Sequence, residues 1–278
     1  MRAISAKKIQ DTVAELCIRA NIFLRRDVLK ALKSASKKET NKRAKELLEA
    51  TIKNARIAGK DKLAICQDTG MPVVFVEIGR DLKIKGDLKS AINKGVESGY
   101  IKGSLRNSVI TDPILRGTPK YSPAIIHIDT VKGNKLKLTV LPKGFGCENK
   151  SQLKMFKPTA NIREIKKFIL DAVKDAGPDA CPPYVLGVGI GGTADYACLL
   201  AQKALLRDIG IGNRQVEIKL LELELLRQVN KLNIGPMGLG GRTTVLAVNI
   251  ETHSTHIAGL PVAVNISCHA LRSATKTL

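Results

Sequence analysis

The pattern of apolar residues changes near residue 60, and this change constrains the fold more than any other feature of the sequence. Before it, apolar residues such as Ile9 and Val13 recur at helical spacing, so residues 1–60 are expected to form helices. After it, short apolar runs such as Val73–Ile78 and Val185–Ile190 have the length of strands and are bounded by Gly or Pro. The sequence therefore predicts an α/β (mixed) fold, with a helical N-terminal part followed by a mixed sheet with flanking helices.

Further elements can be placed in the second part of the chain. Helices are expected at about 86–98, 162–175 and 214–232, where apolar residues recur at helical spacing. Alternating apolar residues predict a β-hairpin over residues 126–140. The stretch Gly99–Ser122 is irregular and rich in Gly and Pro, and a loop of this length inside a compact domain usually has a function.

The chain is strongly basic, with 46 Lys and Arg against 25 Asp and Glu among 278 residues, a formal net charge of +21. Such a charge is typical of nucleic-acid-binding proteins, because basic side chains displace counterions from phosphates. The basic residues are spread over every segment, however, and only 3% of residues are aromatic, so platforms for base stacking would be scarce. We therefore favour a solvated surface or an acidic partner chain, and keep a basic, non-enzymatic nucleic-acid-binding protein as the distant alternative. A field of this sign also attracts anionic substrates.

Location and redox state follow from the same composition. No segment approaches the roughly 20 apolar residues that cross a bilayer, and the first residues lack the apolar stretch of a secretory signal. These features predict a soluble cytoplasmic protein with no membrane contact. The six cysteines are then expected to stay reduced, as metal or cluster ligands or as buried thiols. The sequence contains no Cys-x-x-Cys pair, which argues against zinc ribbons and ferredoxin-type clusters.

Three cysteines, Cys66, Cys181 and Cys268, lie beside Gly, Pro or short polar residues, where a thiolate can face a cavity. An iron–sulfur cluster held by three thiolates keeps one iron open to a substrate oxygen, which is the basis of a hydro-lyase hypothesis. Burial of the three as ordinary thiols is the alternative. The other three cysteines occupy an apolar helix face, a glycine-rich loop and a helix interior, and are expected to be spectators.

Polar residues near these cysteines can be interpreted in two ways. Asp68 could act as a general acid or simply cap the following turn. Arg106, in the long loop, could clamp a carboxylate through two parallel hydrogen bonds or remain in solvent. His256 could donate to a substrate carboxylate or lie on the surface. It could also pair with His253 in a zinc site completed by Cys268 and His269.

A glycine-rich run, Gly187-Val-Gly-Ile-Gly-Gly192, formally matches the Gly-x-Gly-x-x-Gly pattern of dinucleotide-binding folds. Its first glycine falls inside the expected strand, and no acidic residue stands at a convincing strand end about 20 residues later. A glycine strand packed closely against a cluster explains the run equally well.

Several motifs in order along the chain resemble the α subunit, or N-terminal domain, of the two-subunit class I fumarate hydratases and the related L-tartrate dehydratases. The matching stretches are Cys66-Gln-Asp-Thr-Gly70, Lys143-Gly-Phe-Gly-Cys-Glu-Asn149, Ala180-Cys-Pro-Pro-Tyr184, Gly191-Gly-Thr193, Gly235-Pro-Met-Gly-Leu-Gly-Gly-Arg242 and Leu260-Pro-Val-Ala-Val-Asn-Ile-Ser-Cys268. They span residues 66 to 268, whereas the first sixty residues add little to the resemblance.

The resemblance implies a [4Fe-4S] cluster ligated by Cys66, Cys181 and Cys268, with substrate on the fourth iron. It places substrate contacts at Gln67, Asp68, Arg106, the Gly146 backbone and His256, and it makes Asp68 a candidate acid for the leaving hydroxyl. The base, a threonine, and further basic contacts would come from a β subunit. One departure is Cys147, where a serine is commoner in the family, and its role stays open.

The resemblance also implies an organisation and an activity. We expect a single hydro-lyase α-subunit domain over residues 1–278, with a helical portion at 1–60 and a cluster- and substrate-binding portion at 61–278. Only ten residues follow Cys268, which also suggests that a partner subunit completes the site, in an α2β2 heterotetramer. The expected reaction is the reversible hydration of fumarate to L-malate, and dehydration of L-tartrate to oxaloacetate is the alternative.

Overall fold

The computed structural model describes residues 2–278 and places them in two compact units, each made of separate stretches of the chain. The first unit contains the chain up to Arg25, Ala55–Phe145 and Arg272–Leu278, and the second contains Arg26–Asn54 and Gly146–Leu271. One boundary falls inside helix α3 (Lys42–Asp61), so no change of composition marks it. Because two compact units can belong to one domain, the single-domain organisation stays a prediction.

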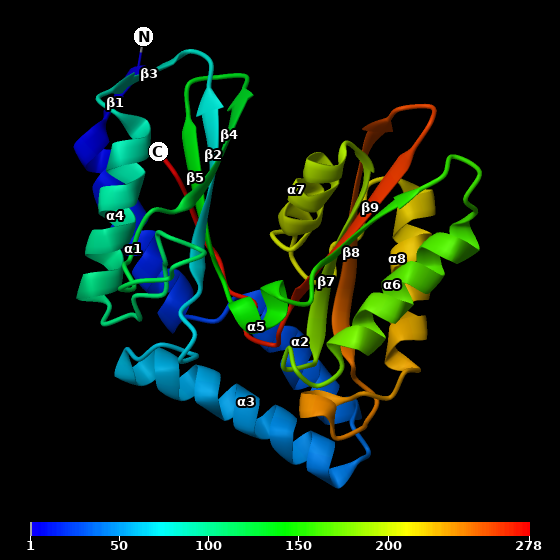
Figure 1. The fold of residues 1–278 in the computed structure, drawn as a ribbon. Coiled ribbons are helices and arrows are strands. Elements are labelled where there is room, and N and C mark those ends of the chain that lie inside the picture. Colours follow the sequence, from blue (N-terminus) through cyan, green and yellow to red (C-terminus); the bar gives the residue numbers. More distant parts are fainter. Residues whose placement is uncertain (1) are drawn as a thin grey trace. The chain divides into compact units, whose positions relative to one another are not determined.

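The first unit is built on a four-stranded sheet with the order β10-β5-β2-β4. Its strands are β2 (Met71–Gly79), β4 (Ile125–Val131), β5 (Leu136–Lys143) and β10 (Ala274–Thr277), and β1 (Arg2–Ser5) pairs with β3 (Leu82–Lys85) in a separate ribbon. Helices α1 (Ala6–Ile22) and α4 (Leu88–Lys102) cover one face of this sheet (Figure 1). The resulting core joins Ile9 and Val13 of α1 to Val74, Val76 and Leu138 of the sheet.

The expected hairpin over residues 126–140 is wrong in its pairing. Both strands form, but β2 lies between them, parallel to β4 and antiparallel to β5. The reason is burial: the run Val73–Val76 is almost completely buried and takes the centre of the sheet, whereas β4 is largely exposed and forms its edge. Alternation alone could not show which strand stands between the other two.

The second unit contains a four-stranded sheet with the order β6-β9-β7-β8. Its strands are β6 (Gln152–Phe156), β7 (Tyr184–Gly192), β8 (Val245–Thr255) and β9 (Leu260–Ser267). Its helices are α2 (Arg26–Lys38), part of α3, the single turn α5 (Phe145–Glu148), α6 (Ile162–Ala176), α7 (Ala194–Ala204), α8 (Val216–Asn230) and the short η1 (Pro236–Gly238). Helix α7 covers one face of the sheet, while α6 and α8 cover the other (Figure 1).

The glycine-rich run of β7 is explained by helix packing. A Cβ atom at Gly187 would lie 2.0 Å from the Ala201 carbonyl oxygen of α7, and one at Gly189 would lie 2.0 Å from that of Ala197. Only glycine allows the helix to approach so closely. The alternate residues Leu186 and Val188 face the other side, in the core with α6 and α8. The run therefore serves the fold, which favours the structural interpretation of this motif over the dinucleotide one.

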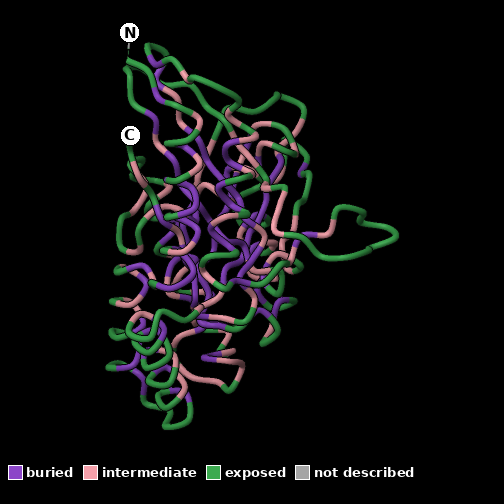
Figure 2. Tube along the Cα trace, turned by 90° about the vertical axis from the view of Figure 1, so that its left-hand side faces the viewer, coloured by how far each residue is buried: buried purple, intermediate pink, exposed green. Residues whose placement is uncertain are grey.

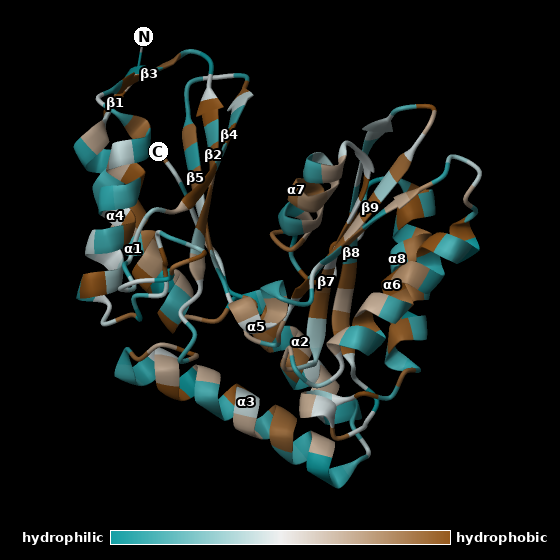
Figure 3. Cartoon of the chain, in the orientation of Figure 1, coloured by the Kyte–Doolittle hydropathy of each residue, from teal (hydrophilic) through white to brown (hydrophobic). Residues whose placement is uncertain are grey.

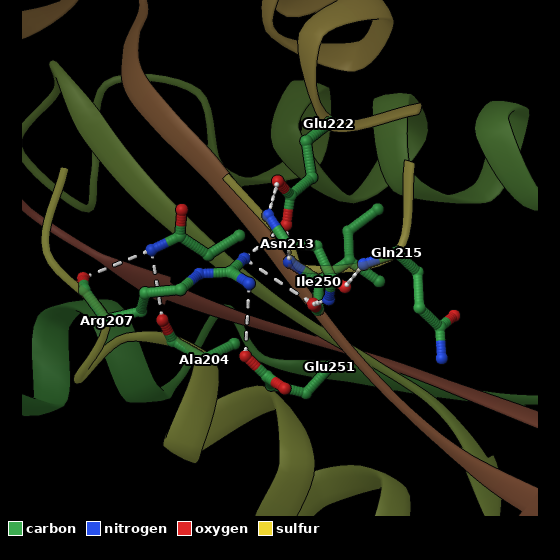
Figure 4. A network of polar contacts seen from close by, with 8 residues as sticks. Ala204, Arg207, Asn213, Gln215, Glu222, Ile250 and Glu251 are labelled. Carbon is green, nitrogen blue, oxygen red and sulfur yellow. Dashed lines mark hydrogen bonds and ion pairs between the residues drawn. The ribbon is translucent and has the colours of Figure 1, made fainter. Parts of the chain in front are cut away.

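A buried polar network fixes the segment between α7 and α8 to strand β8 (Figure 4). Glu222 of α8, only 5% exposed, accepts hydrogen bonds from the backbone N–H groups of Ile250 (2.8 Å) and Asn213 (2.9 Å). It also forms an ion pair with Arg207, whose other terminal nitrogen lies 3.3 Å from Glu251. Each partner offsets the loss of hydration that its neighbour suffers on burial.

These arrangements confirm the mixed α/β fold class and the three helices expected after residue 60, which appear as α4, α6 and α8. Apolar residues concentrate on the inner strands of both sheets (Figure 3). No helix in the described part of the chain, residues 2–278, has the length and apolar character needed to span a lipid bilayer.

Candidate functional site

A tight turn at residues 66–70 joins helix α3 to strand β2 and carries the first group of expected site residues. The Asp68 carboxylate accepts the backbone N–H of Gly70 (2.9 Å) through Oδ1 and that of Phe145 (2.8 Å) through Oδ2. Gly70 has a positive φ of 78°, and a Cβ atom there would lie 2.7 Å from the Pro142 backbone. Asp68 therefore does cap the turn, and it also holds the glycine-rich stretch after β5.

Thr69 connects the same turn to Arg106. Its hydroxyl accepts the Arg106 N–H (3.0 Å) and donates to the Arg106 carbonyl oxygen (3.2 Å). The buried Tyr100 hydroxyl of α4 lies 2.9 Å from the Thr69 carbonyl oxygen and 3.2 Å from that of Gly70. The first unit thus brings together Gln67, Asp68 and Arg106, with the side chains of Gln67 and Arg106 exposed.

Arg272 is a member of this site that the sequence did not reveal. Its side chain is buried, at 4% exposure, and Nη2 donates to the Asp68 carbonyl oxygen. Its Nε and Nη1 atoms are buried without a hydrogen-bond partner among residues 2–278. The contact joins residues 204 positions apart, so no local pattern points to it. Arg272 and Tyr100 together form hydrogen bonds with the carbonyl oxygens of residues 68, 69 and 70. These bonds fix the backbone of the turn beside Cys66.

Cys181 and Cys268 lie close to each other in the second unit. Strands β7 and β9 are antiparallel with Val185 opposite Ser267, so Cys181, three residues before β7, and Cys268, directly after β9, lie at the same sheet end. His269 completes the contact, because its backbone N–H (3.4 Å) and its Nδ1 (3.1 Å) both face the Cys181 carbonyl oxygen. Cys181 is exposed and has a positive φ of 54°, a conformation that is uncommon outside glycine and concentrates at functional sites.

The other three cysteines differ from these in their surroundings. Burial raises the pKa of the Cys17 thiol to about 12, so this group stays protonated and packs in the core. Cys147 is also buried, and its Sγ lies 3.5 Å from the Ala180 carbonyl oxygen, next to Cys181. Cys198 lies on helix α7, where desolvation and then the nearby Glu148 and Asp195 raise its thiol pKa. The raised pKa values of Cys17 and Cys198 disfavour the thiolate form that a metal requires.

Gly146 and His256 lie at different places in the second unit. A Cβ atom at Gly146 would lie 3.9 Å from the Asp179 carbonyl oxygen, so this glycine is close to the segment that precedes Cys181. His256 lies on the turn between β8 and β9, where its Nδ1 accepts the N–H of Ala258 (3.1 Å). The eight residues of β9 therefore separate His256 from Cys268 by roughly 25 Å. This separation also argues against a zinc site that combines the two histidines with Cys268.

The chemistry of the donor set fits an iron–sulfur cluster. Cys66 is partly exposed, Cys181 is exposed and Cys268 is partly exposed, and none of the six cysteines is in a disulfide within residues 2–278. Accessible thiols in loops can reach a soft metal such as iron. Cys66 belongs to the first unit and the other two to the second. The described residues contain no group of three or more His, Cys, Asp or Glu side chains placed to hold a single metal ion.

Comparison with known proteins identifies the family. The family model for fumarate hydratase (Fumerase) matches residues 10–277. This chain belongs to the fumarate hydratase family. Family members are hydro-lyases, so the enzyme class expected from the sequence motifs is confirmed, as is the resemblance itself.

Relatives in this family are similar over almost their whole length. A protein of Methanocaldococcus jannaschii named "Putative L(+)-tartrate dehydratase subunit alpha" is 42% identical over 278 residues, which cover 98% of each chain. The L(+)-tartrate dehydratase subunit alpha of Escherichia coli O157:H7 is 30% identical over 275 residues, which cover 98% of this chain and 91% of the relative. The corresponding protein of Escherichia coli K12 is 29% identical over the same length.

Proposed function

We propose that this chain is the α subunit of an iron–sulfur-dependent hydro-lyase that interconverts fumarate and L-malate. The observation that carries the proposal is the turn at residues 66–70, which presents a partly exposed thiol and a half-buried carboxylate two residues apart on a backbone fixed by Arg272 and Tyr100. The match to the fumarate hydratase family over residues 10–277 supports the reaction class.

The proposed cluster ligands are Cys66, Cys181 and Cys268. The Cys181–Cys268 pair is supported by the shared sheet end and the His269 contact, and Cys66 by its exposure on an ordered turn. When bound, a [4Fe-4S] cluster with three thiolates supplies Lewis acidity at the iron that lacks a cysteine.

Asp68 is the proposed proton donor to the hydroxyl that leaves during dehydration. Its two carboxylate oxygens each accept one backbone N–H, from Gly70 and Phe145, so the side chain has a single defined orientation. A carboxyl oxygen has further lone-pair positions beyond one hydrogen bond, so the group can still exchange a proton with substrate. In the hydration direction the same carboxylate would accept the proton back.

The remaining predicted substrate contacts are Gln67, Arg106, the Gly146 backbone and His256. Arg106 is the strongest of them, because its backbone is tied to Thr69 while its guanidinium stays exposed and able to bind a carboxylate bidentately. His256 is the weakest, since strand β9 separates it from Cys268 in its own unit. The net charge of +21 would attract a dicarboxylate from solution.

A second subunit is proposed to complete the enzyme. The relatives are named as α subunits, and this chain aligns with them over nearly their full length. We infer that a β subunit supplies the base and further basic contacts, in an α2β2 assembly. The names of the same relatives favour L-tartrate as a second candidate substrate, which differs from L-malate by one hydroxyl group.

The test is an activity assay on the α and β subunits of the source organism, co-expressed and purified without oxygen. We expect a brown complex that hydrates fumarate and dehydrates L-malate, with much lower kcat/KM for L-tartrate. A higher kcat/KM for L-tartrate would replace the first substrate with the second. A colourless complex inactive on all three would overturn the proposal, and salt-sensitive DNA binding by such a protein would favour the nucleic-acid alternative.

A further inference from the structure

The long loop between α4 and β4 carries an exposed apolar tip near its middle. All residues from 111 to 120 are exposed, and Figure 2 shows exposed loops of this kind in green. At the tip stand two adjacent aliphatic side chains, Ile114 at 86% exposure and Leu115 at 82%. Isolated exposed aliphatic residues are common, but two neighbours this exposed on one turn present a contiguous apolar surface to solvent.

Hydrogen bonds hold this tip in one conformation. The Asp112 carboxylate accepts the N–H groups of both Ile114 and Leu115 through Oδ1, each at 2.9 Å, and the Asp112 carbonyl oxygen accepts the Arg116 N–H at 3.0 Å. Below the tip, Val109 and Lys120 exchange two backbone hydrogen bonds of 2.9 and 2.7 Å. The two apolar side chains are therefore presented on a preorganised turn, and preorganisation reduces the entropy lost on binding.

The base of the loop is part of the candidate site. Leu105 and Val109 are buried at 4% exposure, and Arg106 between them exchanges two hydrogen bonds with Thr69 in the turn that carries Cys66 and Asp68. A partner that held the tip would thus hold the segment that positions Arg106.

We propose that the tip, Ile114 and Leu115, is the anchor by which this chain docks on its β subunit, in an apolar pocket rimmed by carboxylates. The exposed charged residues around the tip are Arg116, Lys120 and Asp112, which together carry a net positive charge, so a complementary surface is acidic. A second copy of this chain is disfavoured, because each copy carries a net charge of +21 and would bring the same cations to the contact. The relatives named as α subunits supply the kind of partner, so this inference rests on the two-subunit part of the proposed function.

The test is calorimetric titration of the wild-type chain and its variants with the separately expressed β subunit of the source organism. The double variant Ile114→Ser/Leu115→Ser is expected to raise the dissociation constant at least tenfold, because central aliphatic anchors carry much of the affinity of an interface. The matched control is Ile257→Ser, which removes an isoleucine of 87% exposure on the turn between β8 and β9 and should bind like wild type. Asp112→Ala keeps both anchors and loosens the turn, so it should weaken binding by a smaller factor.

Three outcomes would overturn the inference. They are wild-type affinity in the double variant, absence of binding by the wild-type chain, and a change in the self-association of the α chain alone with no change in β binding. Circular dichroism shows whether each variant is folded. The proposed function fails separately: a complex that assembles through the tip but acts on neither fumarate, L-malate nor L-tartrate would remove the reaction and keep the docking site.

Discussion

At the scale of single residues, the half-buried Asp68 is central to the proposed reaction. Its carboxylate accepts two backbone N–H groups, so a capping role and a proton-transfer role are both compatible with its position. The two roles predict different consequences of substitution: loss of a cap lowers stability, whereas loss of a general acid lowers turnover in an enzyme that is still assembled.

Asp68→Asn is therefore expected to lower kcat by about 10²–10⁴-fold while iron content and assembly with the β subunit stay at the wild-type level. An amide keeps one acceptor oxygen for the turn but cannot supply the carboxyl proton. The matched control is Asp195→Asn on helix α7, whose carboxylate bonds to Thr193 and should not affect turnover. Steady-state kinetics of both variants would show whether Asp68 transfers a proton or only caps the turn. Wild-type turnover in Asp68→Asn would remove Asp68 from the mechanism.

Tyr100 gives the turn a predictable pH dependence. Burial raises the pKa of its phenol, whose hydroxyl bonds to the backbone of Thr69 and Gly70. A raised pKa means that the contribution to stability is fully present below the unfolded-state pKa of about 10 and declines as the pH rises above it. Tyr100→Phe should be less stable than wild type by about 1 kcal/mol at neutral pH. The difference in melting temperature should shrink above pH of about 10, and parallel curves would contradict the assignment.

Residues of the candidate site were predictable where the signal is local. Gln67 and Asp68 adjoin a cysteine in the sequence, and the structure places them in one turn with Arg106 nearby. Arg272 was missed, because its contact with Asp68 depends on the last strand returning to the first unit. The separation of His256 from Cys268 was also hidden, since a spacing along the sequence says nothing of a strand lying between two residues.

At the scale of elements, burial decided which expectations held. The helices expected after residue 60 formed because their apolar periodicity matches the face that each buries. The hairpin over residues 126–140 failed because the largely buried strand β2 lies between its two arms. The pairing of strands is set by long-range contacts that no local alternation encodes.

The buried Glu222 network supplies a prediction at this scale. Glu222→Ala should lower the free energy of unfolding by about 3 kcal/mol, because it removes the main counter-charge of Arg207 and leaves two backbone N–H groups unpaired. The comparison is Asp11→Ala, which breaks an exposed ion pair with Lys7 and should cost less than about 1 kcal/mol. Denaturant titration of the purified chain measures both, and equal losses would show that the network contributes no more than a surface pair.

At the scale of the whole molecule, the sequence showed the family but not the division of the chain. The motifs that carry the resemblance run in order from residue 66 to residue 268, and the family match covers residues 10–277. The two compact units, by contrast, interleave along the chain, and one boundary lies inside a continuous helix. The two units share helix α3, and the chain passes from the first to the second after Phe145 and returns after Leu271. Neither composition nor a linker marks these points in the sequence.

The most direct test of the central claim is the iron content of the α chain, purified without oxygen in complex with its β subunit. We predict about four iron atoms per wild-type α chain and the same number in Cys198→Ala, whose thiol lies on helix α7. A large loss of iron is expected in each of Cys66→Ala, Cys181→Ala and Cys268→Ala, because each removes one of three ligands. Wild-type iron in any of these three variants, or its loss in Cys198→Ala, would contradict the proposed ligand set.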